Sequence, residues 1–170
     1  MVHIEDLFTG AADATTAAPI DWDPLREHDA LLEVGLLDCR VCPLTGRSGL
    51  LLDMRTALQY RTGNAALLVV RGMRSFRWRE TPPNTELFNF SVGSSSPTAT
   101  AEAWRIDLGL FIDGELSIEG KSADFYLLNA DALPDAPPNY SGRGLDEVRH
   151  ALPWWDSECT VLEWSSTDGI

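Results

Sequence analysis

The sequence has few cysteines, a single lysine and no long apolar run, and each shortage excludes a class of protein. Three cysteines in 170 residues do not suit a disulfide-stapled secreted domain, because one thiol would stay unpaired. The longest apolar run, residues 65–70, is far shorter than the ~20 residues of a membrane-spanning helix. The N-terminus carries acidic residues where a secretory signal has a basic region. We therefore expect a cytoplasmic protein.

Basic residues are also scarce overall. The formal net charge is -13 and the sequence pI is about 4.4. Nucleic-acid binding needs arginines and lysines that displace counterions from phosphates, and anionic membranes attract the same residues. The composition therefore argues against both kinds of ligand. It favours solubility and encounter with a basic partner, although solubility alone explains most acidic surfaces.

No catalytic or cofactor motif is present. The chain lacks a GxSxG elbow, an HExxH helix, a phosphate-binding glycine loop and EF-hand spacing, and its three histidines are scattered. The sharpest local motif is Cys39-x2-Cys42, whose spacing suits a zinc site or a redox pair. A zinc site would need two further ligands, and no second CxxC supplies them. We expect no cofactor, with an enzyme or metal protein using Cys39 and Cys42 as an alternative.

The pattern of apolar residues predicts one α+β domain over residues 1–170. We expect a curved antiparallel β-sheet of about six to seven strands, with an N-terminal helix and a short late helix. The N-terminal helix is predicted to begin at Pro24 and end near Gly35, and the late helix covers residues 145–152. Residues 9–20 are expected to form a flexible lead-in, and residues 93–100 and 131–144 to form loops.

Three local details bear on the sheet. Residues 50–60 fit either a strand or a helix. Residues 67–78 fit one strand, with a bulge near Gly72. In residues 104–112 every second residue is Trp, Ile or Leu, and the positions between them form a largely wet face; Asp113-Gly114 then predicts a hairpin. We favour a three-residue loop that pairs Ile112 with Leu116, because that register keeps one apolar face.

Charge is unevenly distributed along the chain. Residues 47–79 hold seven arginines and one acid, giving +6, while the rest of the chain carries -19. The candidate binding residues are the arginines of this segment and tryptophans near element ends: Arg71, Arg74, Arg77, Arg79, Trp78, Trp154 and Trp155. Clustered arginines beside aromatic rings suit the recognition of anions or of an acidic partner. The structural alternative is that acids elsewhere in the fold neutralise the arginines.

These patterns favour a non-catalytic binding protein, an acidic cytoplasmic protein-interaction module. An immunity-like or antitoxin-like protein that neutralises a basic toxic domain is one concrete version. The alternative is a small-molecule binding protein with a pocket inside the curved sheet, lined by Trp78, Trp104, Phe125 and Tyr126. We expect a protein partner, and the sequence leaves the oligomeric state open.

Overall fold

The protein is mostly β, and its computed structural model describes residues 1–14, 16–80 and 85–169. The short helices are α1 (Ile4–Thr9), α2 (Leu145–Val148) and the 3-10 helices Arg149–Ala151 and Thr167–Gly169. The strands are β1 (Val2–His3), β2 (Ala18–Pro19), β3 (Gly35–Cys42), β4 (Arg47–Asp53), β5 (Ala65–Arg71), β6 (Ser75–Glu80), β7 (Phe90–Ala99), β8 (Trp104–Phe111), β9 (Gly114–Gly120), β10 (Ser122–Ala130) and β11 (Glu158–Ser166).

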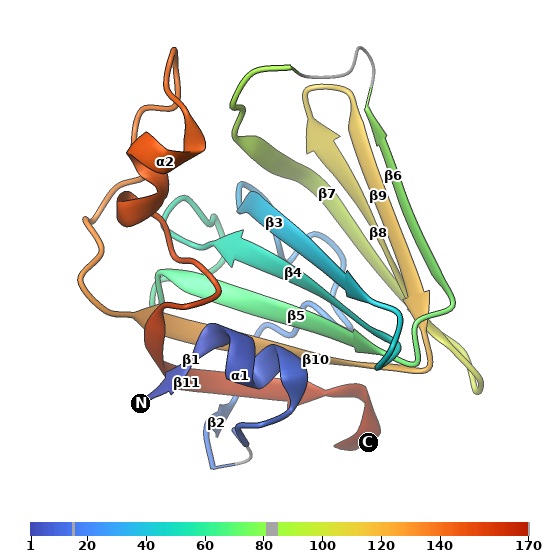
Figure 1. The fold of residues 1–170 in the computed structure, drawn as a ribbon. Coiled ribbons are helices and arrows are strands. Elements are labelled where there is room, and N and C mark those ends of the chain that lie inside the picture. Colours follow the sequence, from blue (N-terminus) through green and yellow to red (C-terminus); the bar gives the residue numbers. More distant parts are fainter. Residues whose placement is uncertain (15, 81–84, 170) are drawn as a thin grey trace.

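The eleven strands of the described residues belong to one sheet. The order is β1-β11-β10-β5-β4-β3-β7-β8-β9-β6, and β2 pairs with β11 in a parallel sense, whereas the other pairs of described strands are antiparallel. The sheet is open, neither closed nor strongly curled, which corrects the expected curvature and the count of six to seven strands. It has two arms (Figure 1): the first arm contains β3, β4, β5, β10 and β11, and the second arm contains β7, β8, β9 and β6.

In the described residues the strand pairing between the two arms is short: β3 and β7 pair at Gly35 with Ser91 and at Leu36 with Phe90. They also meet at a corner, where the Lys121 N–H donates to the carbonyls of Arg71 and Gly72. Gly72 has a φ of +60°, and a Cβ there would lie 2.9 Å from Lys121 Cβ. The expected strand over residues 67–78 is therefore broken at Gly72 into β5 and β6, which lie in different arms.

Apolar side chains cover both faces of the first arm. One cluster lies between the arms and includes Leu50, Leu68, Ile106, Ile118 and Phe125. A second cluster packs beneath α1, where Ile4, Leu7 and Phe8 meet Leu51, Val69 and Trp155 on the opposite face. Because both faces are covered, successive residues of β4, β5 and β10 are nearly all buried, and buried and exposed positions do not alternate along these strands. The strand alternative for the start of residues 50–60 is confirmed.

The expected helix between Pro24 and Gly35 is absent. Asp29 and Glu33 have positive φ values of 59° and 65°, which a helix does not allow. Their backbone N–H groups donate to Ser95 and Val92 of β7 instead of to the segment itself. Tertiary hydrogen bonds thus replace the helical ones, and the segment fills the gap that opens where β7 diverges from β3.

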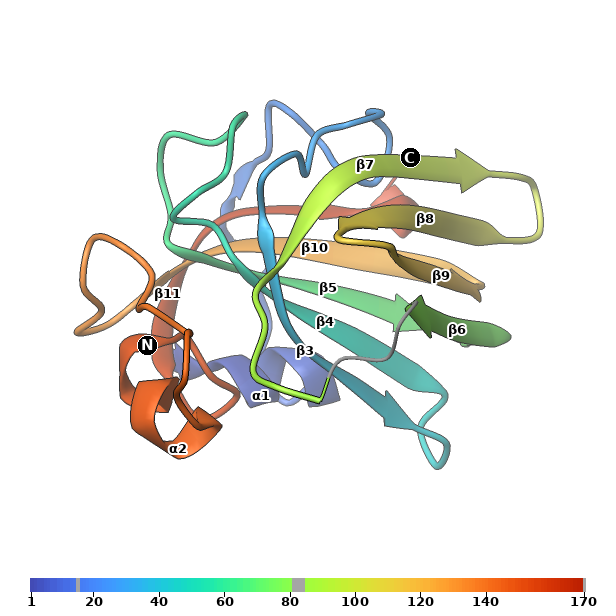
Figure 2. The same cartoon turned by 90° about the horizontal axis from the view of Figure 1, so that it is seen from above.

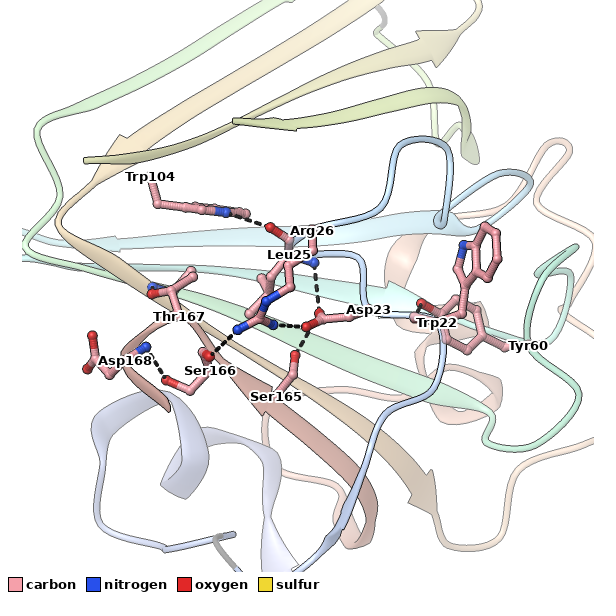
Figure 3. Close-up of polar contacts among 11 residues, drawn as sticks. Trp22, Asp23, Leu25, Arg26, Tyr60, Trp104, Ser165, Ser166, Thr167 and Asp168 are labelled. Carbon is pink, nitrogen blue, oxygen red and sulfur yellow. Dashed lines mark hydrogen bonds and ion pairs between the residues drawn. The ribbon is translucent and has the colours of Figure 1, made fainter. Parts of the chain in front are cut away.

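A polar cluster fixes the start of the same segment (Figure 3). The buried carboxylate of Asp23 accepts hydrogen bonds from the Leu25 N–H, the Ser165 hydroxyl and the Arg26 guanidinium. The indole of Trp104 donates to the Leu25 carbonyl at 2.9 Å. Asp23 therefore does not cap a helix. It holds the start of this segment against Ser165 of β11.

Two of the expected loops differ from the structure. Residues 93–100 were expected to form a loop, but most of them lie in β7, where Ser94, Ser96 and Thr98 pair with residues of β8. Sheet pairing overrides the weak β-propensity of serine. Residues 9–20 include the end of α1 and strand β2, and Thr15 lies outside the described residues. Residues 131–144 contain no helix or strand.

The β8–β9 hairpin keeps a single apolar face, as expected, but its register is shifted. Leu116 pairs with Leu108 and Leu110 pairs with Gly114, so the three-residue loop covers residues 111–113 and Ile112 is exposed. The late helix over residues 145–152 is confirmed as α2 and the 3-10 helix that follows it. No helix in the described part of the chain is long and apolar enough to cross a bilayer.

Candidate binding face at the edge strand β6

The outer face of the second arm is a polar ladder of side chains. Strand register aligns Arg77 with Ser117 and Arg79 with Glu115, and it places Arg105 opposite Glu119. This face forms a depression of about 820 Å³. At Gly109 the neighbouring Ser94 hydroxyl takes the place of a side chain, since a Cβ there would lie 2.5 Å from Ser94 Oγ. The chemistry of this depression is hydrogen bonding and charge, with cations on the outermost strand.

Strand β6 is the last strand of this arm, and in the described residues no strand pairs with its far edge (Figure 2). Its central residues, Arg77, Trp78 and Arg79, are all exposed. The alternation of side chains puts the two arginines on the outer face and Trp78 on the other. The edge therefore presents backbone hydrogen-bonding groups flanked by cations on one side and an aromatic ring on the other.

The charges of the two β6 arginines are only weakly compensated. Arg79 lies 4.0 Å from the carboxylate of Glu115, and the two side chains are 77% and 71% exposed. Such an exposed pair contributes about 0–1 kcal/mol. Among the described residues no ion pair within 4 Å engages Arg77, but the charge of Arg77 helps to lower the pKa of Asp107, so this carboxylate partly compensates it. Two strands further in, on β8, Arg105 and Asp107 bind each other at 2.8 Å. Although partial burial opposes ionisation of Asp107, its hydrogen bonds from Arg105 and Ser117 lower its pKa.

Exposed aromatic rings gather on the other face of β6. Trp78 and Phe90 form an edge-to-face pair with ring centroids 5.1 Å apart, and Phe88 packs on Phe90 in the same way at 5.0 Å. Trp78 is 39% exposed and Phe88 is 38% exposed. We call Trp78, Phe88 and Phe90 the aromatic trio. It lies at the opening between the arms and offers an apolar surface next to the β6 edge.

The predicted arginine patch is divided by the fold. Arg71 binds Asp124 and Asp168, so carboxylates neutralise it as the structural alternative supposed. Burial opposes the charge of Arg71, but its bonds to Asp168 and Asp124 raise its pKa. Arg74 donates to the carbonyl of Glu102 and lines a separate depression with Arg26 and Lys121. Only Arg77 and Arg79 share a face, because Gly72 turns the chain between the arms.

Trp154 and Trp155 pack within the fold of the first arm and not at the β6 edge. Trp155 is fully buried, and its indole N–H donates to Asp38 at 2.7 Å, while Phe8 and Arg40 pack on its ring. Trp154 is half-buried, with the Arg149 guanidinium 5.9 Å from its ring centre. Both lie on the side of the first arm away from the core between the arms. Trp155 thus holds the chain before β11 against the sheet, and neither residue joins the β6 edge.

The cysteine pair does not converge. Cys39 packs against the core between the arms, and Cys42 against the cluster on the opposite face, because positions three apart on a strand point to opposite sides. Burial and Asp38 raise the pKa of the Cys39 thiol to about 12. Hydrogen bonding with Thr45 lowers the pKa of Cys42. The two thiols therefore cannot bind the same metal ion. The described residues also hold no group of three metal-ligating side chains.

The four residues proposed to line an internal pocket do not face one cavity. Trp104 and Phe125 are buried in the apolar cluster between the arms. Tyr126 lies in the cluster on the other face of the first arm, and Trp78 is exposed near the opening. Phe125 and Tyr126 are consecutive residues of β10, so their side chains point to opposite faces of the first arm.

Sequence reasoning missed two parts of the β6 face. One is the polar ladder of Arg105, Asp107 and Glu115. The sequence predicts a largely solvent-exposed face for their hairpin, but it does not indicate that this face continues onto β6. The other is the aromatic trio, in which Trp78 of β6 and Phe88 both pack on Phe90 of β7, although β8 and β9 lie between β6 and β7 in the sheet. The alternating arginines of β6 were the one signal available in the sequence for this face.

Comparisons with known proteins do not indicate a family or a function for this chain. No family model matches the chain, and no curated protein matches it. A crystal structure of an uncharacterized protein from Neisseria gonorrhoeae is similar over 58% of this chain and 94% of its own, with a TM-score of 0.43 and 10% identity. A likeness of that size carries no argument about function.

Proposed function

We propose that this protein is a non-catalytic protein-interaction module that binds an acidic segment of a partner at the β6 face. The observation that carries the proposal is the exposed pair Arg77 and Arg79 on a strand whose far edge has no partner in the described residues. Edge strands often carry charges that block aggregation. Here the same charges also select a partner of opposite sign, because complementary charge accelerates encounter and suppresses wrong partners.

Charge reversal tests the proposal directly. The probe is a fluorescent blocked peptide of alternating Glu and Val residues, about as long as β6, and its binding is followed by anisotropy at peptide concentrations up to about 1 mM. We expect binding that weakens with salt and is lost in the Arg77→Glu/Arg79→Glu variant. The matched control is Arg61→Glu/Arg143→Glu, which makes the same change of charge at two exposed arginines outside β6. This control is expected to bind like the unchanged protein.

Two outcomes contradict the proposal. Equal loss in both variants would show that only the total charge matters. Binding of a Lys-Val peptide in place of the Glu-Val peptide would overturn the acidic partner and favour the immunity-like version, in which the acidic remainder of the surface meets a basic domain.

A further inference from the structure

The β6 edge offers two kinds of contact along one line. On the outer face Arg77 and Arg79 stand two residues apart, and on the inner face Trp78 lies between them. A ligand that follows this edge as a strand would alternate its own side chains between the same two faces. Its outer residues would meet the guanidinium groups, and its inner residues would meet the aromatic trio.

We propose that the partner segment joins the sheet as an additional strand beside β6, with acidic residues at every second position and apolar residues between them. This inference rests on the proposed function and specifies its mode of binding. An edge strand has N–H and C=O groups that point away from the sheet, and an added strand satisfies them with main-chain hydrogen bonds. The alternation of charge and aromatic surface then selects the sequence of that strand.

A second copy of this chain is a poorer occupant of the same edge. Pairing β6 with β6 of another copy would bring Arg77 and Arg79 of each chain next to the same arginines of the other. Like charges directly opposite each other on paired strands are destabilising. The edge therefore disfavours self-association and fits a heterologous strand with carboxylates at the outer positions.

Other features of the molecule are less suited to an added ligand. In the depression with Arg26, Arg74 and Lys121, Arg26 already binds Asp23 and the carbonyl of Ser166 (Figure 3). The far edge of β11 pairs with β1 and β2. The β6 edge combines exposed side chains on both faces with an unpaired strand in the described residues.

Backbone methylation of the probe tests the strand mode. Two Glu-Val peptides carry N-methyl groups either on every Glu or on every Val, so each peptide loses the donors of one edge only. Strand addition predicts that one methylated peptide binds about tenfold or more weakly, because the edge facing β6 loses its donors, while the other binds like the parent. Hydrogen exchange of the β6 amides is expected to slow when the parent peptide binds.

The aromatic trio is tested by a second pair of peptides. Replacing Val with Ser in the probe is expected to weaken binding to the unchanged protein about tenfold, and this preference for Val is expected to shrink in Phe88→Ala. Trp22→Ala is the matched control, since Trp22 is 44% exposed but lies on the segment before β3, and it is expected to keep the preference.

The outcomes separate the two proposals. If the parent peptide binds and depends on Arg77 and Arg79, but both methylated peptides have equal affinity, the strand mode is overturned and the acidic-partner function stands. If the parent peptide does not bind at all, the proposed function fails and the strand mode fails with it. Loss of the preference for Val in both Phe88→Ala and Trp22→Ala would overturn the part assigned to the aromatic trio.

Discussion

Removal of either partner from the ion pair between Asp53 and Arg55 is expected to destabilise the fold strongly, because both side chains are only 3% exposed. Arg55 binds the carboxylate through Nε at 2.9 Å and through a terminal nitrogen at 2.8 Å. Its other terminal nitrogen donates to the carbonyls of Pro134 and Ala136, at 3.1 and 3.2 Å. The pair therefore fastens the loop over residues 131–144 to the end of β4.

Removing one partner would leave the other charge with little solvent and no counterion. Arg55→Ala and Asp53→Ala are each expected to lower the free energy of unfolding by about 3–5 kcal/mol. The double variant is expected to lose less than the sum of the two, by about 0.5–3 kcal/mol, because the second change removes a charge that the first has already stranded. The whole stability of a domain is about 5–15 kcal/mol, so the single variants should be visibly weakened.

Urea unfolding followed by tryptophan fluorescence measures these differences, with the slope of each transition showing whether unfolding stays two-state. The matched control is the exposed pair Arg149 and Asp156, whose side chains are 47% and 65% exposed. Its single alanine variants are expected to change stability by about 0–1 kcal/mol. If the Arg55→Ala variant were no less stable than the Arg149→Ala variant, the argument from burial would be refuted.

Two further predictions follow from shifted pKa values. Iodoacetamide at about pH 8 should label Cys42 before Cys39 and Cys159, because the thiolate reacts, and mass spectrometry of the peptides would show any other order. Burial raises the pKa values of Tyr126 and Tyr140 to about 12, above the ordinary value of about 10. The unfolded chain then releases these protons first, so the contribution of these tyrosines to stability should be complete below about pH 10 and should be lost as the pH rises towards 12. Chemical unfolding across this range, together with tyrosinate absorbance, checks the sign, and tyrosines that ionise near pH 10 in the folded protein would contradict it.

Many individual strands were predictable because their signals are local. The alternation of residues 104–112 records one buried and one wet face within a single segment, and it predicts β8 without knowledge of any other strand. The short late helix ends before Pro153, which lacks the donor that a helix interior needs. The CxxC motif shows the limit of such reading, since its spacing is the same whether the thiols converge or lie on opposite faces of a strand.

The sequence by itself determined the β character of the chain, its acidic charge and the concentration of arginines between residues 47 and 79. Only the tertiary structure decided which of those arginines act together, because the turn at Gly72 sends Arg71 to the first arm and Arg77 and Arg79 to the second. It also decided against a helix before β3, since Asp29, Leu31 and Glu33 donate their backbone hydrogen bonds to β7 and not to the segment itself. The pairing of strands distant in sequence is set by the whole sheet at once, and no local pattern encodes it.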